Sequence, residues 1–592
     1  MNPRPFLFTL TFAALLLRIP NAAADPQLTS WQTVGTSQYA RIYESTAAET
    51  ARTPSTTWSR GTGVQSAPTY GGVSKVVYSA NWVYLRTTGL ATHVMGPWYL
   101  NAAKTQNFPN FPSNNAKIYR IPRTPVIPAT KTLTGLGATG IMVNGVSMFD
   151  SRDAFSYVNA SATDATPVNG LTGDGVWNRD GYHNEGVTFD PALAHQAGNN
   201  YHYHAHPIGL RYQLGDHVDY DAATNRYTEQ TTPVTRHSPI VAWAADGLPV
   251  YGPYGYSKPQ EATSGVRRMV SGFALRDGTN GTTNLTTAGR TSLPPWATRT
   301  QAVAFKSGPA VNATYLLGHY IEDFDYLGDR GFTIGTDFDL NEQNVRFCVT
   351  PEFPTGTYAY FTPLKADGTP MFPYTTGRQY FGTPSGGNST ISEAVTTQFS
   401  GGPNASAELN PPTLNRINGN VTLTWSAVEG GTYLAEASPD LTNWPDLTPT
   451  VVAAGSIAAL VENGAANNAD RRFYRVSRTS LAAFDSNGFD YTAPGGGGGS
   501  SAVAPGGSAA AGTTVTILIT LPATPPNPPA AVVPTSITLA GTINGTALSR
   551  PSATTAQATF VIPAGTAVGA KNVVITFNPG PAYTLTNGFT IN

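Results

Sequence analysis

Turn-forming residues recur along the whole chain and limit the length of any regular element. The 592 residues include 60 glycines and 47 prolines, and both residue types interrupt helices and the interiors of strands. Threonine, valine and tyrosine are common between them, which favours strands. The sequence therefore predicts a mainly β protein, with a large β-rich N-terminal domain followed by two small antiparallel β-sandwich domains.

The first 24 residues have the composition of a secretory signal peptide. A positive charge at Arg4 precedes an apolar run over residues 6–17, and three alanines at 22–24 offer a cleavage site. We therefore expect an exported protein, secreted or held at a cell surface. The apolar run is shorter than the roughly 20 residues of a membrane span, and no later segment is longer, so no membrane span is expected.

Composition shifts divide the remaining chain. Residues 27–383 are rich in aromatic side chains and hold all nine histidines. A polar stretch over 384–410 reads as a linker, a second unit follows over 411–479, and a Gly/Ser/Ala-rich linker over 480–512 includes five consecutive glycines at 495–499. The last unit covers 513–592. Chains of this length usually form several domains.

Alternating patterns indicate the architecture of the two C-terminal units. Val421, Leu423 and Trp425 share one strand face in the first, and apolar residues alternate over 515–521 and 573–577 in the second. Residues 432–436, 440–444 and 473–476 resemble a fibronectin type III-like sandwich, and residues 513–592 resemble an immunoglobulin-like domain of the IPT/TIG type. Such modules imply a spacer or adhesive role, with a cell-surface or glycan partner.

Charge and cysteine content exclude some functions. The formal net charge is -1 and no basic run occurs, so nucleic acid is not an expected partner. Cys348 is the only cysteine, which rules out an intrachain disulfide. Its strand-like surroundings favour a buried thiol over a metal ligand.

The histidines are concentrated in one segment. Seven of them lie between His183 and His237, and three alternate at positions 202, 204 and 206. On a strand, residues i and i+2 share a face and lie about 6.6 Å apart. Imidazoles placed in this way can converge on one metal ion, since each ring nitrogen must approach to about 2.0 Å.

These residues define a candidate metal site. His202 and His204 are the first candidate ligands, His206 and His195 the next, and His183 or His237 a further choice, with His217 also available. Glu185, Asp190 and Asp216 are candidate oxygen ligands or hydrogen-bond acceptors for the rings. Nitrogen-rich sites suit zinc, copper or iron. The alternative is a buried network in which histidines and tyrosines only form hydrogen bonds.

The same segment resembles a known family. Residues 200–204 with Pro207, then residues 237–240 and 246–256, strongly resemble the YHYH domain family, and the resemblance extends over about residues 70–383. Many relatives carry a cysteine and Asn-Gly-His before the motif, where this chain has residues 190–195 ending in His195. The resemblance implies an exported, modular protein and locates the site, but it implies no substrate.

Three functions follow from these observations. The first is a secreted or cell-surface protein with a histidine-ligated transition metal. The second is a secreted metalloenzyme, an oxidoreductase or hydrolase, with Glu185 or Asp246 as a candidate catalytic base. The third is a non-catalytic adhesion or glycan-binding protein in which the histidines are structural.

Acidic residues also cluster at Glu322, Asp323, Asp325 and Asp329 and again over 337–342. Both clusters depart from the calcium-loop pattern. We therefore expect solvated loop carboxylates there.

Overall fold

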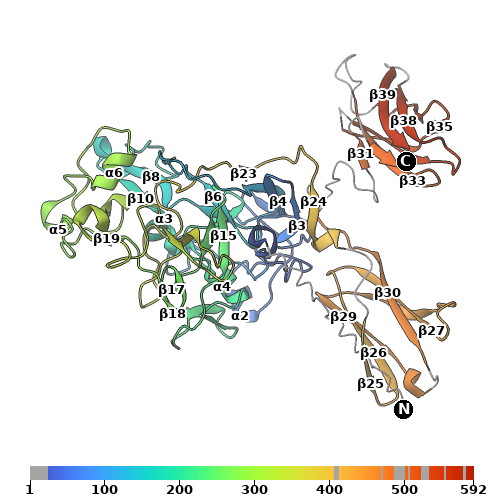
Figure 1. The fold of residues 1–592 in the computed structure, drawn as a ribbon, viewed down its shortest axis with the longest axis horizontal. Coiled ribbons are helices and arrows are strands. Elements are labelled where there is room, and N and C mark those ends of the chain that lie inside the picture. Colours follow the sequence, from blue (N-terminus) through green and yellow to red (C-terminus); the bar gives the residue numbers. More distant parts are fainter. Residues whose placement is uncertain are drawn as a thin grey trace, which may run out of the picture.

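The protein is described by a computed structural model that covers residues 25–405, 412–467, 471–485, 501–503, 507–521, 532–552, 555–577 and 582–591. The predicted signal peptide at 1–24 and the glycine run at 495–499 lie outside the described residues. The prediction of a mainly β fold is confirmed. Figure 1 shows a large N-terminal region and two smaller β-rich units.

The largest sheet of the N-terminal region has eight strands and carries the YHYH motif at one edge. Its spatial order is β11 (His195–Ala197), β12 (Asn200–Tyr203), β7 (Ser147–Phe149), β6 (Ala138–Met142), β15 (Ile240–Ala244), β16 (Pro249–Tyr251), β22 (Thr357–Phe361) and β21 (Val345–Cys348). The pairs β12/β7 and β16/β22 are parallel and the others are antiparallel.

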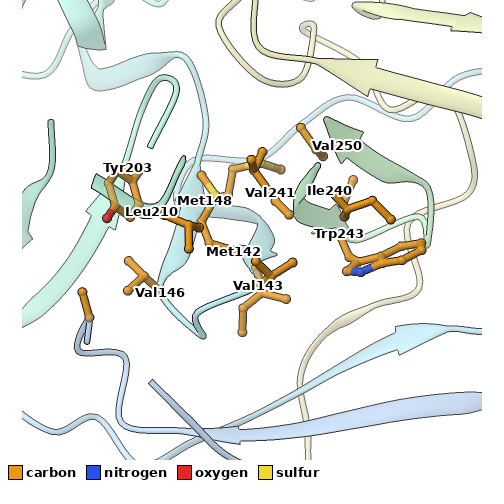
Figure 2. Packing of buried hydrophobic residues seen from close by; sticks show 14 of the residues in the cluster. Met142, Val143, Val146, Met148, Tyr203, Leu210, Ile240, Val241, Trp243 and Val250 are labelled. Atoms are coloured by element: carbon orange, nitrogen blue, oxygen red, sulfur yellow. The ribbon is translucent and has the colours of Figure 1, made fainter. Parts of the chain in front are cut away.

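A second sheet of five strands packs against the first. Its order is β23 (Gly387–Asn388), β5 (Lys117–Pro122), β4 (Trp82–Thr87), β3 (Val73–Tyr78) and β24 (Thr396–Ser400). Apolar side chains from both sheets form one core cluster. Every residue of β15 is buried, as expected for a strand covered on both faces. Figure 2 shows Ile240, Val241 and Trp243 of this strand beside Met142 and Met148.

Short elements complete this region. The helices are α1 (Pro26–Thr29), α2 (Thr46–Ala51), α3 (Gly181–Glu185), α4 (Ile208–Gln213), α5 (Leu285–Ala288) and α6 (Pro295–Thr300). The 3₁₀ turns are η1 (Asn159–Ser161), η2 (Gly186–Thr188), η3 (Ile321–Asp323), η4 (Leu327–Arg330) and η5 (Gly402–Asn404). The small strands are β1 (Trp58–Arg60), β2 (Gly63–Gln65), β8 (Arg152–Val158), β9 (Thr163–Asp164), β10 (Asn178–Asp180), β13 (Val218–Asp221), β14 (Arg226–Glu229), β17 (Tyr254–Lys258), β18 (Glu261–Arg268), β19 (Phe273–Leu275) and β20 (Phe324–Tyr326). No helix among the described residues is both long enough and apolar enough to cross a membrane.

The first acidic cluster is not solvated, and that expectation was wrong. Glu322, Asp323 and Asp325 are fully buried. Arg290, which is itself buried, donates to both carboxylate oxygens of Asp323 at 2.7 Å. Arg330 pairs with Asp325. Buried carboxylates need such partners because an unpaired charge in the interior is strongly destabilising. Arg290 lies well before its carboxylate in the sequence, whereas Arg330 follows closely after Asp325.

Part of the segment predicted as a linker over 384–410 forms two strands on the N-terminal region. β23 pairs with β5, and β24 pairs with β3, so this segment supplies both edge strands of the five-stranded sheet. Its polar composition suits edge strands, where one side of the backbone is open to water. Residues 406–410 lie outside the described part.

The second unit contains two three-stranded antiparallel sheets. One has β25 (Thr413–Ile417), β26 (Asn420–Ser426) and β29 (Ile457–Glu462), and the other has β28 (Asp446–Val452), β27 (Thr432–Ser438) and β30 (Phe473–Ser480), with η6 at Ala465–Asn467. The predicted alternation is confirmed, since Val421, Leu423 and Trp425 are buried.

This second unit is fastened to the N-terminal region through Glu429. The carboxylate of Glu429 accepts hydrogen bonds from the guanidinium of Arg41 at 2.9 and 2.7 Å and from the backbone N–H of Tyr39 at 2.8 Å. Tyr70 donates its hydroxyl hydrogen to the backbone oxygen of Glu429. Val428 packs with both tyrosines, so an apolar contact accompanies the ion pair.

The third unit has two sheets around one core. They contain β31 (Ser501–Val503), β33 (Thr514–Thr520), β37 (Thr555–Val561) and β36 (Thr546–Ser552), and β32 (Gly507–Ala509), β39 (Ala582–Ile591), β38 (Gly569–Thr576), β34 (Ser536–Leu539) and β35 (Ile543–Asn544). Ile517 and Ile519 from the first sheet and Val573 and Ile575 from the second share the core. The predicted alternation of apolar residues is confirmed here too.

Candidate metal centre

Three histidines meet at the edge of the eight-stranded sheet. His195 on β11 faces His202 on β12 across the antiparallel pair, and His204 follows directly after β12. The Nε2 atoms of His195 and His202 are 3.1 Å apart, and those of His202 and His204 are 3.0 Å apart. All three side chains are buried, and their ligand atoms lie within 4.8 Å of one another.

The alternation along β12 separates these rings from the tyrosines of the motif. Tyr201 and Tyr203 point into the core between the two large sheets, where Figure 2 shows Tyr203 near Leu210. His202 lies on the other face and stacks on Phe149, with ring centroids 3.8 Å apart. Both tyrosines are therefore packing residues of the core.

The other ring nitrogen of each histidine is held by an oxygen. Nδ1 of His202 lies 2.9 Å from the carbonyl oxygen of Asn200, and Nδ1 of His204 lies 2.7 Å from that of Asp150. A carbonyl oxygen can only accept a hydrogen bond, so both Nδ1 atoms carry hydrogen.

The same argument applies to His195. Its Nδ1 lies 2.7 Å from the hydroxyl oxygen of Thr188, and that hydroxyl donates its one hydrogen to the carbonyl oxygen of Glu185. The Thr188 oxygen must therefore accept from Nδ1. In their neutral forms, all three rings thus present an Nε2 lone pair to one shared point, which is the tautomer that metal-ligating histidines adopt.

This arrangement argues against a hydrogen-bond network alone. When two neutral rings both carry their hydrogen on Nδ1, no hydrogen lies between their facing Nε2 atoms. A single proton on His204 would leave two lone pairs facing each other at 3.1 Å between His195 and His202. A cation at the shared point would attract the lone pairs in both close contacts, between His195 and His202 and between His202 and His204. Two nitrogens that are 3.0 Å apart, each about 2.05 Å from an ion, form an N–metal–N angle of about 95°. This angle is within the range of metal coordination.

Glu185 adds a carboxylate to the cluster. It ends α3, and its Oε2 lies 3.0 Å from Nε2 of His204 and 3.6 Å from Nε2 of His195. Burial acts to raise the pKa of Glu185, but the hydrogen bond and charge of His204 outweigh it and the pKa is lowered. If a metal ion replaced the hydrogen on Nε2 of His204, this ionised carboxylate would be a suitable fourth ligand or a base.

Burial keeps the histidine rings neutral, with one exception. It lowers the pKa of His195 to about 4 and that of His202 well below its ordinary value. For His204 burial also acts to lower the pKa, but the hydrogen bond and charge of Glu185 raise it overall. Neutral imidazole is the form that binds metal.

The structure does not bring the other predicted histidines to this cluster. His206 is buried and its Nδ1 accepts from Arg211 at 3.1 Å. His183 lies near His319, with ring centroids 5.7 Å apart. His237 packs against Tyr251 and Tyr256, and His217 bonds to the carbonyl oxygen of Thr232.

The remaining predicted carboxylates serve the fold. Asp190 accepts from the Tyr201 hydroxyl at 2.7 Å and from the N–H of Gly96. Asp216 pairs with Arg211. Asp246 accepts from the Tyr360 hydroxyl and from the N–H groups of Leu248 and Gly382, so it stabilises a turn and lies apart from the histidines. The expectation that Cys348 is buried is confirmed.

Sequence reasoning missed the residues that orient the rings. Thr188, Phe149, Phe189 and the carbonyl of Asp150 all contact the cluster. Backbone acceptors leave no signal in a sequence. For Thr188 and Phe189 the signal was their place within residues 70–383, the range over which the chain resembles the family.

Fold and site together define a β-rich, multidomain protein with a buried three-histidine group able to hold a metal ion. Residues 118–375 match the family described as YHYH protein, so the chain carries a YHYH domain over these residues. The stretch includes the three histidines and Glu185. No curated protein matches the chain.

Proposed function

We propose that this chain is an exported protein whose YHYH domain holds one transition metal ion on the Nε2 atoms of His195, His202 and His204. The main support is that Nδ1 of each of these histidines donates a hydrogen bond to an oxygen atom, which leaves Nε2 free to bind the ion. Glu185 completes the donor set from the side of His204. A nitrogen-rich set with one carboxylate suits zinc, copper or iron.

The metalloenzyme reading depends on Glu185. A carboxylate that leaves the ion on substrate arrival would open a coordination position and supply a base beside it. The second and third units, which we propose to be fibronectin III-like and IPT/TIG-like modules, would place this centre on a cell surface or glycan. In each of these units two sheets pack around one hydrophobic core, which supports that proposal.

Metal analysis of the purified full-length protein tests the proposal. We expect about one transition metal ion per chain, bound by three or four protein ligands. His202→Gln removes the central nitrogen and should lower the metal content at least tenfold. His217→Gln is the matched control, because His217 bonds to a backbone carbonyl away from the cluster. Wild-type protein that takes up no metal, or equal loss in both variants, would refute the site.

Acidification should release the ion. The pKa of His204 is raised above its ordinary value of 6.5, so a proton competes with the ion for Nε2 as the pH falls through that raised pKa. His195, with a pKa of about 4, is protonated only in stronger acid. Dialysis at pH 8 and at pH 5 followed by metal analysis should show retention at the higher pH and loss at the lower. Equal retention at both would contradict this.

A further inference from the structure

A cavity of about 660 Å³ shares a wall with the metal centre. Phe189 lines this cavity, and its ring also contacts His195 edge-on, at 4.9 Å between centroids, and lies parallel to His204 at 6.2 Å. Gly186 and Val187, which follow Glu185 in the chain, line it as well. At Phe189 the wall between cavity and cluster is one side chain thick.

The cavity is lined by polar residues such as Asp277 and Lys365 and by a set of apolar side chains that keep part of their surface exposed. Apart from Phe189, they include Val187, Leu193, Leu275, Leu317, Phe324 and Met371. Phe324 stacks on Phe372, with centroids 4.6 Å apart. Concave apolar surface of this kind is unfavourable in water and is typical of ligand sites.

Two bulky residues hold left-handed backbone conformations at this cavity. Leu193 has φ 67° and Tyr374 has φ 70°, and both line it. Such conformations are costly for residues with a Cβ and concentrate at ligand sites. The carboxylate of Asp190 fixes the first by accepting from the N–H of Ala192 and Ala194. The hydroxyl of Tyr374 donates to Asp180.

The neighbouring cavity supplies polar groups. Tyr182, Leu193 and Lys365 line both spaces, and the second cavity, of about 880 Å³, also contains His206 and Glu229. Nδ1 of His206 accepts from Arg211, so its Nε2 carries hydrogen. A ligand with an apolar ring in the first cavity can extend a hydroxyl toward the second.

We propose that the cavity beside Phe189 binds a small, flat aromatic alcohol against the metal centre. Aromatic walls favour a ring through edge-to-face and stacked contacts. Binding rests on the cavity alone. Its coupling to the ion rests on the proposed metal function and on Phe189, which lines the cavity and contacts the rings of His195 and His204.

Binding of 2-naphthol to the full-length protein tests this, by calorimetry. The wild type should bind it saturably at one site. Leu317→Trp fills the cavity and should weaken binding at least tenfold, whereas Leu316→Trp should change it less than twofold. Leu316 is exposed, adjacent in sequence and outside the cavity. Thermal melting shows whether both variants fold. Absent saturable binding, or equal effects of the two variants, would overturn the proposal.

Two further measurements separate this proposal from the metal function. His202→Gln should still bind 2-naphthol while lacking the ion. In the wild type, 2-naphthol should slow removal of the ion by EDTA at least threefold. If the protein binds 2-naphthol but no metal, the metal function is refuted and the ligand site is supported. If it binds metal but no 2-naphthol, the ligand site is refuted and the metal function is supported. An unchanged EDTA rate in protein that binds both would overturn the coupling.

Discussion

Removing the ion with a chelator should destabilise the N-terminal region of the wild-type protein by about 3–4 kcal/mol, when free metal in the reference sample is about 100–1,000 times its Kd. The ion binds the folded cluster and has no comparable site in the unfolded chain. Without it the lone pairs of His195 and His202 face each other at 3.1 Å. Thermal unfolding with and without chelator, followed by tryptophan fluorescence, gives the difference.

His202→Gln is the control for this effect. Because the variant lacks the central nitrogen, its unfolding temperature should not change when chelator is added. If the wild type is equally insensitive to chelator, the cluster holds no ion under these conditions and the energetic argument fails. Sensitivity in both proteins would place the ion elsewhere.

Arg290→Ala should lower the stability of the same region by about 3–5 kcal/mol. Arg290 and Asp323 are both fully buried, and Arg290 also donates to the carbonyl oxygens of Pro309 and Leu316. The substitution leaves a buried carboxylate without its counter-charge and frees three carbonyl oxygens, because that of Tyr315 also accepts from Arg290. Urea unfolding followed by tryptophan fluorescence measures the loss, since Trp177 and Trp296 lie in this region.

Arg299→Ala is the matched control, with the same change at an exposed pair. Arg299 is 47% exposed and pairs with Asp329 and Glu342, and exposed ion pairs contribute about 0–1 kcal/mol each. A loss at Arg290 no larger than the loss at Arg299 would show that burial does not control the strength of these pairs.

The fold was predictable where a period-two pattern met one buried face. Val421, Leu423 and Trp425 in the second unit and Ile517 and Ile519 in the third are buried as their alternation indicates. The order of strands in the eight-stranded sheet was not predictable, because β12 pairs in parallel with β7. Such pairings join distant segments and leave no local pattern.

The site was predictable in part. The alternation at positions 202 and 204 predicted two converging rings, and these two lie 3.0 Å apart at Nε2. It also suggested His206, but β12 ends at Tyr203, and His206 lies just before α4, where its ring contacts Arg211 of that helix. His195 joins the cluster through strand pairing. Glu185 joins it through the end of α3, a contact that needs the tertiary fold.

The edge strands β23 and β24 and the contacts of Glu429 determine where this chain can be truncated. A fragment that stops at residue 383 loses β24, which leaves β3 with a bare hydrogen-bonding edge, and it uncovers Tyr39 and Tyr70. Open edges next to apolar surface promote self-association. Truncation at residue 383 should give a fragment that aggregates. A longer fragment that ends after the second unit should remain monodisperse.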